Sequence, residues 1–255
     1  MAGESYAIPP KDRAIEGILW YIQSNGLAGG DRLPAERELC EIIGVSRTAL
    51  RAAIARLISC GDLESRRGSG TFVCPPKPLN VFQETYNYSD AVRRAGQVPS
   101  SRLVEARMGE ADDALARKMS IRPGDPVLTL RRVRLVNDVP ASIETAQVNA
   151  SLCPGLETHD FGCESLYDVL LEQGGVRVEH GREHISISRL NAEEAELLEA
   201  EEGTPVFFET SVEYDRDMRV VECCKAVVLP TKYRFADNGE ANGVATEVGE
   251  EWLRQ

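Results

Sequence analysis

The sequence predicts an α+β protein of two domains: three helices and a β-hairpin first, then a mixed α/β domain with a mainly antiparallel sheet. Two patterns carry this prediction. Apolar residues recur at helical spacing up to about residue 61, and strand–turn–strand patterns alternate with short helices after about residue 110. A proline-rich break at residues 74–78 separates the two patterns, and a length of 255 residues suits two medium domains.

The domain boundaries follow from that break. Proline restricts the backbone and lacks an N–H donor, so three prolines in the four positions 75–78 suit a stiff linker. We expect a first domain over residues 1–74, a linker over 75–84, a second domain over 85–238 and an acidic tail over 239–255.

Charge divides unequally at the linker. The formal net charge of −12 argues by itself against a nucleic-acid partner, because DNA binding relies on Lys and Arg to neutralise phosphates. The first 76 residues, however, hold nine basic and nine acidic residues, so the whole acidic excess belongs to the C-terminal part. The N-terminal domain therefore remains compatible with DNA.

Composition also bears on the compartment. No apolar run approaches the ~18 residues of a membrane span, and the first residues lack the pattern of a secretory signal. The seven cysteines include no CxxC pair, so we expect free thiols in the cytoplasm and no membrane partner. The vicinal pair Cys223–Cys224 leaves a redox role open.

Three helices are expected before the linker. The first follows Pro9-Pro10 and stops near Asn25-Gly26, and the second runs from about Ala35 to Gly44. The third follows Ser46, a good N-cap, and stops at Gly61. The tight Gly44-Val45 turn predicts a helix-turn-helix, and residues 63–73 read as a hairpin with a glycine-rich tip.

This order suggests a DNA-reading surface. In a helix-turn-helix the second helix presents its N-terminal residues to base edges in the major groove. Arginine suits guanine, while hydroxyls and a helix N-terminus suit phosphate. The alternative is a solvated helix with ordinary surface arginines. The candidate DNA contacts are Arg37, Ser46, Arg47, Thr48, Arg51, Arg66, Arg67, Gly68 and Gly70.

After the linker, helices and hairpins alternate. Helices are expected over Ala111–Met119, Glu164–Gln173 and Asn191–Glu202, and strands over Val127–Val136, Ala141–Val148, Val176–Arg189, Phe207–Tyr214 and Val220–Leu229. The segment Gly124-Asp125-Pro126-Val127 is echoed by Gly203-Thr204-Pro205-Val206, each between a helix and a hairpin. Either two related halves share one sheet, or the similarity is one that β-hairpins commonly show by chance.

A binding site is expected on this sheet. Arg132 and Arg134 share a strand face with apolar residues, and a buried unpaired charge is costly, so both arginines need carboxylates or a bound anion. Glu144 and Glu222 are candidate partners, and the alternative is a purely structural pairing. Ser165 opens a helix, whose N-terminus favours anions. The candidate site is Arg132, Arg134, Glu144, Ser165, Tyr167 and Glu222.

One motif resembles a metal site. Residues His180-Gly181-Arg182-Glu183-His184 fit the H-x-x-E-H pattern of a zinc peptidase group. That chemistry needs both histidines on one helical face, whereas Gly181 and the alternation after residue 184 favour a strand. We therefore expect no metal, no cofactor and no catalytic residue.

The N-terminal motifs carry a specific resemblance. Residues 33–39 (LPAEREL), 44–48 (GVSRT) with Arg51, and 68–73 (GSGTFV) resemble the winged-helix domain of the GntR family of bacterial transcriptional regulators. The resemblance implies that Arg37, Arg47, Thr48, Arg51 and the wing glycine contact DNA. Three residues depart from the family pattern, namely Ala35, Ala49 and Ala52, and Ala49 removes one phosphate or base contact that the family's usual threonine would make.

Residues 85–236 resemble the UTRA effector domain of the HutC subfamily. The matching stretches are 132–135 (RVRL), 153–156 (CPGL), 165–167 (SLY), 191–195 (NAEEA), 203–206 (GTPV), and Tyr214-Asp215 followed by Val221-Glu222. The resemblance implies a chorismate-lyase-like fold that binds a small effector, of the sugar phosphate or small organic acid class.

Together these expectations describe a homodimeric regulator, more specifically a repressor, that binds palindromic operator DNA and responds to a metabolite. Two alternatives stay open: a chorismate-lyase-like enzyme domain fused to a DNA-binding head, and a DNA-binding protein whose C-terminal domain only dimerises.

Overall fold

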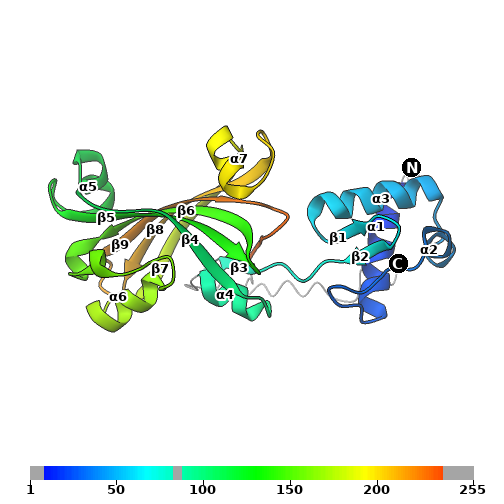
Figure 1. The fold of residues 1–255 in the computed structure, drawn as a ribbon, viewed down its shortest axis with the longest axis horizontal. Coiled ribbons are helices and arrows are strands. Elements are labelled where there is room, and N and C mark those ends of the chain that lie inside the picture. The colour runs from blue at the N-terminus through cyan, green and yellow to red at the C-terminus, as the bar shows by residue number, and fades with distance from the viewer. Residues whose placement is uncertain (1–8, 83–87, 238–255) are drawn as a thin grey trace, which may run out of the picture. The chain divides into compact units, whose positions relative to one another are not determined.

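The computed structural model describes residues 9–82 and 88–237 (Figure 1). The expected acidic tail, residues 239–255, lies outside the described residues, as do residues 83 and 84 of the expected linker. The chain divides into two compact units, Met1–Lys77 and Pro78–Gln255. Within the described ranges, no helix is long and apolar enough to cross a membrane.

The first unit is a three-helix domain with a two-stranded wing. It contains α1 (Pro10–Ser24), α2 (Glu36–Ile43), α3 (Arg47–Cys60) and the antiparallel strands β1 (Leu63–Arg66) and β2 (Gly70–Val73). Each glycine that follows α2 and α3 adopts the left-handed conformation that ends a helix without steric cost. The apolar faces of the helices meet in one core, with Ile18, Leu39 and Leu50 fully buried.

The second unit is built on a six-stranded antiparallel sheet in the order β4-β5-β6-β9-β8-β7. A separate parallel pair joins β3 to β10. The elements are β3 (Leu79–Phe82), α4 (Tyr88–Arg94), β4 (Pro99–Glu110), α5 (Asp113–Met119), β5 (Pro126–Val136), β6 (Val139–Asn149), α6 (Leu166–Gly174), β7 (Val178–Arg189), α7 (Ala192–Leu198), β8 (Pro205–Asp215), β9 (Val220–Val228) and β10 (Arg234–Asp237).

Helices cover both faces of the large sheet (Figure 1). Helix α6 packs through Leu166 and Leu170 against Leu128 and Leu130 of β5, and α4 lies on the same face. Helices α5 and α7 cover the opposite face. The first face also holds the polar site described below, because the arginines of β5 follow Leu128 and Leu130 at period two.

The echo between the two halves of the domain is a structural repeat. The N–H of Gly124 donates to the Ala111 carbonyl, and the N–H of Gly203 donates to the Leu190 carbonyl, both at 2.9 Å. The β5–β6 and β8–β9 hairpins then meet at the centre of the sheet, where β6 pairs with β9. The strand order of one half is therefore mirrored by the other.

Several boundary predictions were wrong. The helix expected over residues 191–202 ends at Leu198. Glu199 adopts the left-handed conformation, and its N–H donates to the carbonyls of Ala195 and Glu196. The strand expected over 141–148 is longer at both ends and runs from Val139 to Asn149, with Glu144 in its middle. Helix α6 and strand β7 each begin two residues later than expected.

Two larger elements were missed, β4 and α4. Strand β4 is an edge strand with a bulge between Leu103 and Glu105, and most of its side chains are exposed. An exposed, bulged strand lacks the regular apolar alternation that marks a half-buried one. Helix α4 has seven residues, which is too short for a clear helical period.

Candidate functional site

The start of α3 forms a compact polar surface. The Ser46 hydroxyl accepts a hydrogen bond from the Ala49 N–H at 3.2 Å, so Ser46 is the N-cap and its oxygen is already engaged. Arg47, Thr48 and Arg51 are exposed, and their spacing of three and four residues places them along one helix face. The other face of α3, with Leu50, packs into the core. Helix packing thus leaves these three side chains free to meet DNA.

Surface ion pairs hold two of the arginines without burying them. Arg51 Nε lies 3.5 Å from Glu36 Oε1, and Arg37 Nε lies 3.4 Å from Glu41 Oε1. The Arg37 and Arg51 side chains are 80% and 73% exposed, so these pairs contribute little stability and can exchange for phosphate or base contacts.

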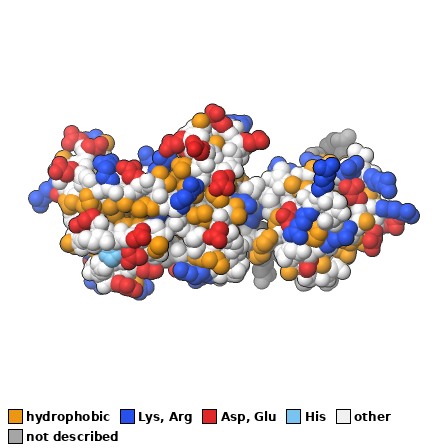
Figure 2. All heavy atoms as spheres, in the orientation of Figure 1, with side chains coloured by type: hydrophobic (Ala, Val, Ile, Leu, Met, Phe, Trp, Pro, Cys, Tyr) orange, Lys and Arg blue, Asp and Glu red, His pale blue; other side chains and the backbone are white. Residues whose placement is uncertain are grey.

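The hairpin forms a wing beside these helices. Gly68 and Gly70 both have positive φ, which lets the chain reverse between β1 and β2. Arg66 pairs with Glu64 and lies over the Phe72 ring at 4.2 Å, while Arg67 is exposed at the tip. Figure 2 shows Lys and Arg side chains spread over the visible surface of this unit.

Sequence reasoning missed Arg32. Its backbone bridges to Phe72 of the wing, and its Nε would lie 2.8 Å from a Cβ at Gly70. Arg32 therefore adds an exposed guanidinium beside Gly70, where β2 begins after the tip of the wing. It precedes the helix-turn-helix by several residues, and only the β-bridge brings it to the wing.

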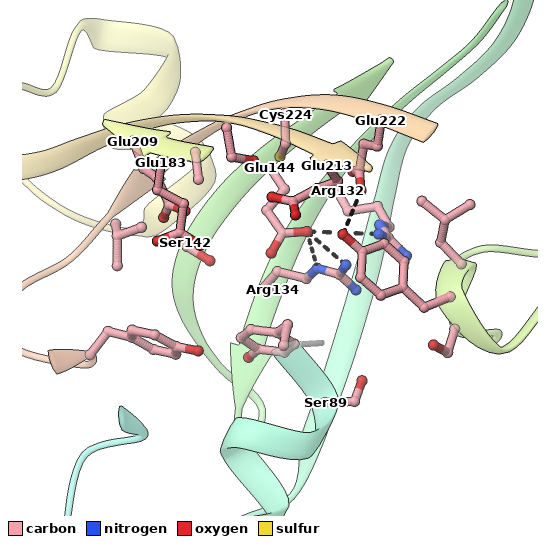
Figure 3. A pocket seen from close by; sticks show the side chains of 18 residues that line it. Ser89, Arg132, Arg134, Ser142, Glu144, Glu183, Glu209, Glu213, Glu222 and Cys224 are labelled. Atoms are coloured by element: carbon pink, nitrogen blue, oxygen red, sulfur yellow. Dashed lines mark hydrogen bonds and ion pairs between the residues drawn. The ribbon is translucent and has the colours of Figure 1, made fainter. Parts of the chain in front are cut away.

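A cavity in the second unit contains all six residues of the second candidate site (Figure 3). It lies between the sheet face of β5, β6, β8 and β9 and the helices α4 and α6, with a volume of about 120 Å³. One ordered water needs roughly 10–15 Å³, so the cavity has room for several water molecules. Its lining is mainly polar.

Arg134 is firmly paired within this cavity. Its Nε and Nη2 both lie 2.6 Å from Glu144 Oε2, and its Nη1 donates to Ser101 Oγ at 2.9 Å. The guanidinium also lies 5.0 Å from the centre of the Tyr88 ring, whose hydroxyl donates to the Leu135 carbonyl. Arg134 thus has partners for all three guanidinium nitrogens within the protein.

The same pairing does not account for Arg132. Its Nη2 lies 3.7 Å from Glu144 Oε2, beyond hydrogen-bond distance, and its Nε and Nη1 are buried without a hydrogen-bond partner. Burial, and then the nearby charge of Arg134, lower the pKa of Arg132 to about 10. A buried guanidinium with two unused nitrogens is ready to donate to an acceptor.

The remaining candidates close one end of the cavity. The Tyr167 hydroxyl donates to Glu222 Oε2 at 2.8 Å, and burial raises the pKa values of both groups. Ser165 is the N-cap of α6, with its hydroxyl 3.4 Å from the Asp168 nitrogen. The cavity thus combines hydroxyl groups, carboxylates and guanidinium groups.

Sequence reasoning missed most of the other polar residues. Glu209 and Glu213 lie on the same face of β8, and polar residues at this spacing suggest a face exposed to solvent. In the structure both residues line the cavity. Burial and neighbouring carboxylates raise the pKa of each to about 8. The other missed polar residues of the lining are Tyr88, Ser89, Ser142, Glu183, Ser211, Cys224 and Tyr233.

The H-x-x-E-H segment lies in β7, as its alternation suggests. Glu183 from that segment reaches the cavity, and a Cβ on Gly181 would lie 2.5 Å from Glu213 Oε2, so Gly181 leaves room for that carboxylate. Among the described residues, no group of His, Cys, Asp or Glu is arranged to hold a metal ion. Cys223 and Cys224 point to opposite faces of β9, the first into the core and the second into the cavity.

The carboxyl groups of β8 predict that the free energy of unfolding depends on pH. Glu209 ionises near 4.5 when unfolded and near 8 when folded, so its contribution to folding is full below pH 4.5 and is lost as pH rises through 8. We therefore expect Glu209→Gln to match the wild type near pH 4.5 and to exceed its free energy of unfolding at pH 9. Urea titrations followed by circular dichroism measure this difference. A difference that does not change with pH, as expected for the exposed control Glu179→Gln, would contradict it.

Comparison with known proteins follows the same division. Residues 10–73 match the family described as bacterial regulatory proteins, gntR family, and residues 94–234 match the UTRA domain. The transcriptional repressor PhnF of Mycolicibacterium smegmatis is 35% identical over 202 residues, covering 78% of this chain and 80% of PhnF. The transcriptional repressor NagR of Bacillus subtilis is 28% identical over 228 residues, covering 89% and 93%.

Solved structures agree with these matches. The crystal structure of PhnF from Mycobacterium smegmatis aligns with a TM-score of 0.64 and 30% identity, covering 86% of this chain and 97% of that one. A further relative by sequence, the histidine utilization repressor of Pseudomonas aeruginosa, is 30% identical over 195 residues, which is 76% of each protein. These relatives are DNA-binding regulators rather than enzymes. The chain therefore belongs to the GntR family of bacterial transcriptional regulators, with a winged helix-turn-helix and a UTRA domain of the HutC type.

Proposed function

We propose that this regulator is a homodimeric cytoplasmic repressor that binds a palindromic operator. In this arrangement each copy inserts the first turns of α3 into one major groove, and the two half-sites lie about one helical turn apart or a multiple of it. The observation that carries the proposal is the exposed row of Arg47, Thr48 and Arg51 on a helix whose other face is fully packed. The names of the PhnF and NagR relatives support repression.

The second part of the proposal concerns the effector. Arg132 offers two unpartnered donor atoms inside a mainly polar cavity that is partly open to solvent, which suits a small metabolite with a carboxylate or phosphate group, such as a sugar phosphate or a small organic acid. Binding changes operator affinity only if the effector prefers one arrangement of the two heads. A domain that served dimerisation alone would have no need for such a cavity.

Selection of bound DNA tests the first part. The purified full-length protein is incubated with random duplexes, and the retained sequences are expected to share an inverted repeat bound by two copies of the chain. Mass measurement of the complex gives the stoichiometry. Retention of a single half-site by one copy would overturn the dimeric proposal, and retention without any shared sequence would overturn operator recognition.

Titration of the selected operator complex tests the second part. Sugar phosphates and small organic acids are added singly while fluorescence anisotropy reports bound DNA. At least one compound is expected to lower operator affinity by about 5- to 150-fold, the usual range of coupling between two sites. A compound that lowers the affinity for non-specific DNA by the same factor acts only by screening the charge of the DNA, and does not count as an effector.

A further inference from the structure

The effector cavity contains more carboxyl groups than guanidinium groups. Five glutamates and two arginines line it, and they come from four different strands of the sheet and from β7 at its edge. A cavity made only for an anion would be expected to carry an excess of positive charge. The carboxylates are Glu144, Glu183, Glu209, Glu213 and Glu222.

Internal contacts satisfy only part of this charge. Glu144 pairs with Arg134 at 2.6 Å, and Glu222 accepts the Tyr167 hydroxyl. No Lys or Arg side chain in the described ranges forms an ion pair with Glu183, Glu209 or Glu213. Glu213 has a side-chain hydrogen bond with Ser211, whereas Glu183 and Glu209 are available to a group that enters the cavity.

The register of the sheet separates the unmatched charges. Arg132 pairs with Glu144, Glu144 with Ala226, and Ala226 with Glu209, so Arg132 and Glu209 occupy the two ends of one row. Three strand spacings correspond to about 14 Å between their backbones. In Figure 3 Glu183 and Glu209 lie on the side of the cavity away from Arg132.

The orphaned Arg132 is the independent sign of a ligand. Its side chain is 3% exposed, and its Nε and Nη1 have no hydrogen-bond partner. Burying such donors without an acceptor costs free energy, so an acceptor from outside the chain suits this end. At the other end Glu183 is exposed and Glu209 is half-buried, so a cation that enters from solvent can reach both carboxyl groups.

A metal ion does not explain the acidic end. The described residues contain no group of His, Cys, Asp or Glu side chains that could hold one. An organic ammonium group fits better, because its three donors can reach carboxylates that are too far apart to share a metal.

We propose that the effector is amphoteric, with a carboxylate or phosphate toward Arg132 and a protonated amine toward Glu183 and Glu209. This inference rests on the proposed effector-binding function and narrows it to amine-containing metabolites. The row from Arg132 to Glu209 is then the axis along which the ligand lies.

Amine binding also requires an ionised Glu209. Burial and neighbouring carboxylates raise its pKa to about 8, so binding an ammonium group below pH 8 releases a proton. Affinity for an amine is thus expected to fall about 25-fold from pH 8.5 to 6.5, as the ionised fraction of Glu209 falls. The groups that face Glu209 are Glu183 from β7, Glu213 from β8, Glu222 and Cys224 from β9, Glu144 from β6, and Tyr233.

Matched probes test the proposal on the full-length protein. The first series compares ω-amino carboxylates of three to six carbons with the corresponding ω-hydroxy carboxylates, and the second compares 3-aminopropyl phosphate with 3-hydroxypropyl phosphate. Simple alkylamines and Mg²⁺ alone complete the set. Calorimetry in two buffers of different ionisation enthalpy gives affinity and proton release. At least one amino probe is expected to bind ten times more tightly than its hydroxy partner, and the two series distinguish carboxylate from phosphate.

Variants locate the two ends. Glu209→Gln and Glu183→Gln are each expected to lower the affinity for the amino probe at least tenfold and to leave the affinity for the hydroxy probe unchanged. Arg132→Gln is expected to lower the affinity for both probes. Glu179→Gln, which is exposed on β7 outside the cavity, is the control.

Three outcomes would overturn the inference: equal affinity for amino and hydroxy probes, no binding by any amino probe, or binding by Mg²⁺ that excludes the amine. Equal affinities would still leave an anionic effector in place. If an amino probe binds without changing operator affinity, the charge preference of the cavity stands and the proposed regulatory function fails instead.

Discussion

Replacing both Arg47 and Arg51 with alanine is expected to lower affinity for the selected operator at least a hundredfold. A bidentate arginine–guanine contact discriminates by about 1–3 kcal/mol, each 1.4 kcal/mol is a factor of ten, and every substitution counts twice in a dimer. Both side chains are exposed, and Arg51 has only a surface pair with Glu36, so folding should be little affected. Anisotropy at fixed salt concentration measures the loss.

The control for this prediction lies on the same helix. Arg56 is nine residues after Arg47, which is two and a half turns, so it emerges from the opposite side of α3. Arg56→Ala removes the same charge, and we expect at most a small, uniform loss of affinity for all DNA sequences. If the double variant at 47 and 51 keeps the affinity of the wild type, α3 does not read the operator through these arginines.

Arg134→Ala is expected to destabilise the C-terminal unit by about 3 kcal/mol. The Arg134 and Glu144 side chains are only 11% and 19% exposed, and removal of one partner leaves a mostly buried charge without compensation. Arg132, at 3.7 Å, cannot replace the two close contacts to Glu144. Denaturant unfolding measures the loss, and addition of Glu144→Gln is expected to recover part of it because the uncompensated charge is then gone.

Its neighbour Arg131 provides the control. Arg131 points to the other face of β5, where its Nη1 lies 2.6 Å from Glu193 Oε1, and Glu193 is 64% exposed. Arg131→Ala should therefore cost no more than about 1 kcal/mol. A similar loss for both variants would mean that burial does not decide the energy of the Arg134 pair.

Arg134→Ala is also expected to keep operator binding and to weaken the response to the effector. The reason is that the residue lies in the cavity of the second unit and in neither the wing nor α3. Operator release by the effector, measured at a temperature where the variant is folded, tests this. A normal response would remove Arg134 from the effector site and leave it as a structural residue.

The opposite charges of the cavity come from the repeat. Arg132 and Arg134 lie on β5 of the first hairpin, and Glu209 and Glu213 lie on β8 of the second. The two hairpins have the same backbone arrangement and meet through β6 and β9, so their polar faces open into one space. A repeated fold with unlike side chains thus places guanidinium groups from β5 and carboxyl groups from β8 in one cavity.

Local patterns were sufficient to predict the N-terminal unit. Helix caps at Ser46, Gly44 and Gly61, the apolar spacing of α3 and the glycine-rich tip all act over a few residues, so the helix-turn-helix and its wing were correctly predicted. The echoed Gly-x-Pro-Val segments likewise marked a repeat that the sheet confirms. The exposed arginines of the first unit needed only the helical period to be placed on one face.

The polar cavity depended on contacts between distant strands. Strand alternation shows that Arg132 and Glu209 each face one side of a sheet, but not that β6 pairs with β9 and so aligns them in one row. Nor does it show that β7 brings Glu183 to the rim, or that Arg134 takes Glu144 and leaves Arg132 without a partner. Sequence alone determined the protein class and the exposed face of α3 that we propose reads DNA, because short-range spacing sets helices and caps. Only the tertiary structure decided the charge of the effector cavity, because that charge depends on strand order and register between segments up to about a hundred residues apart.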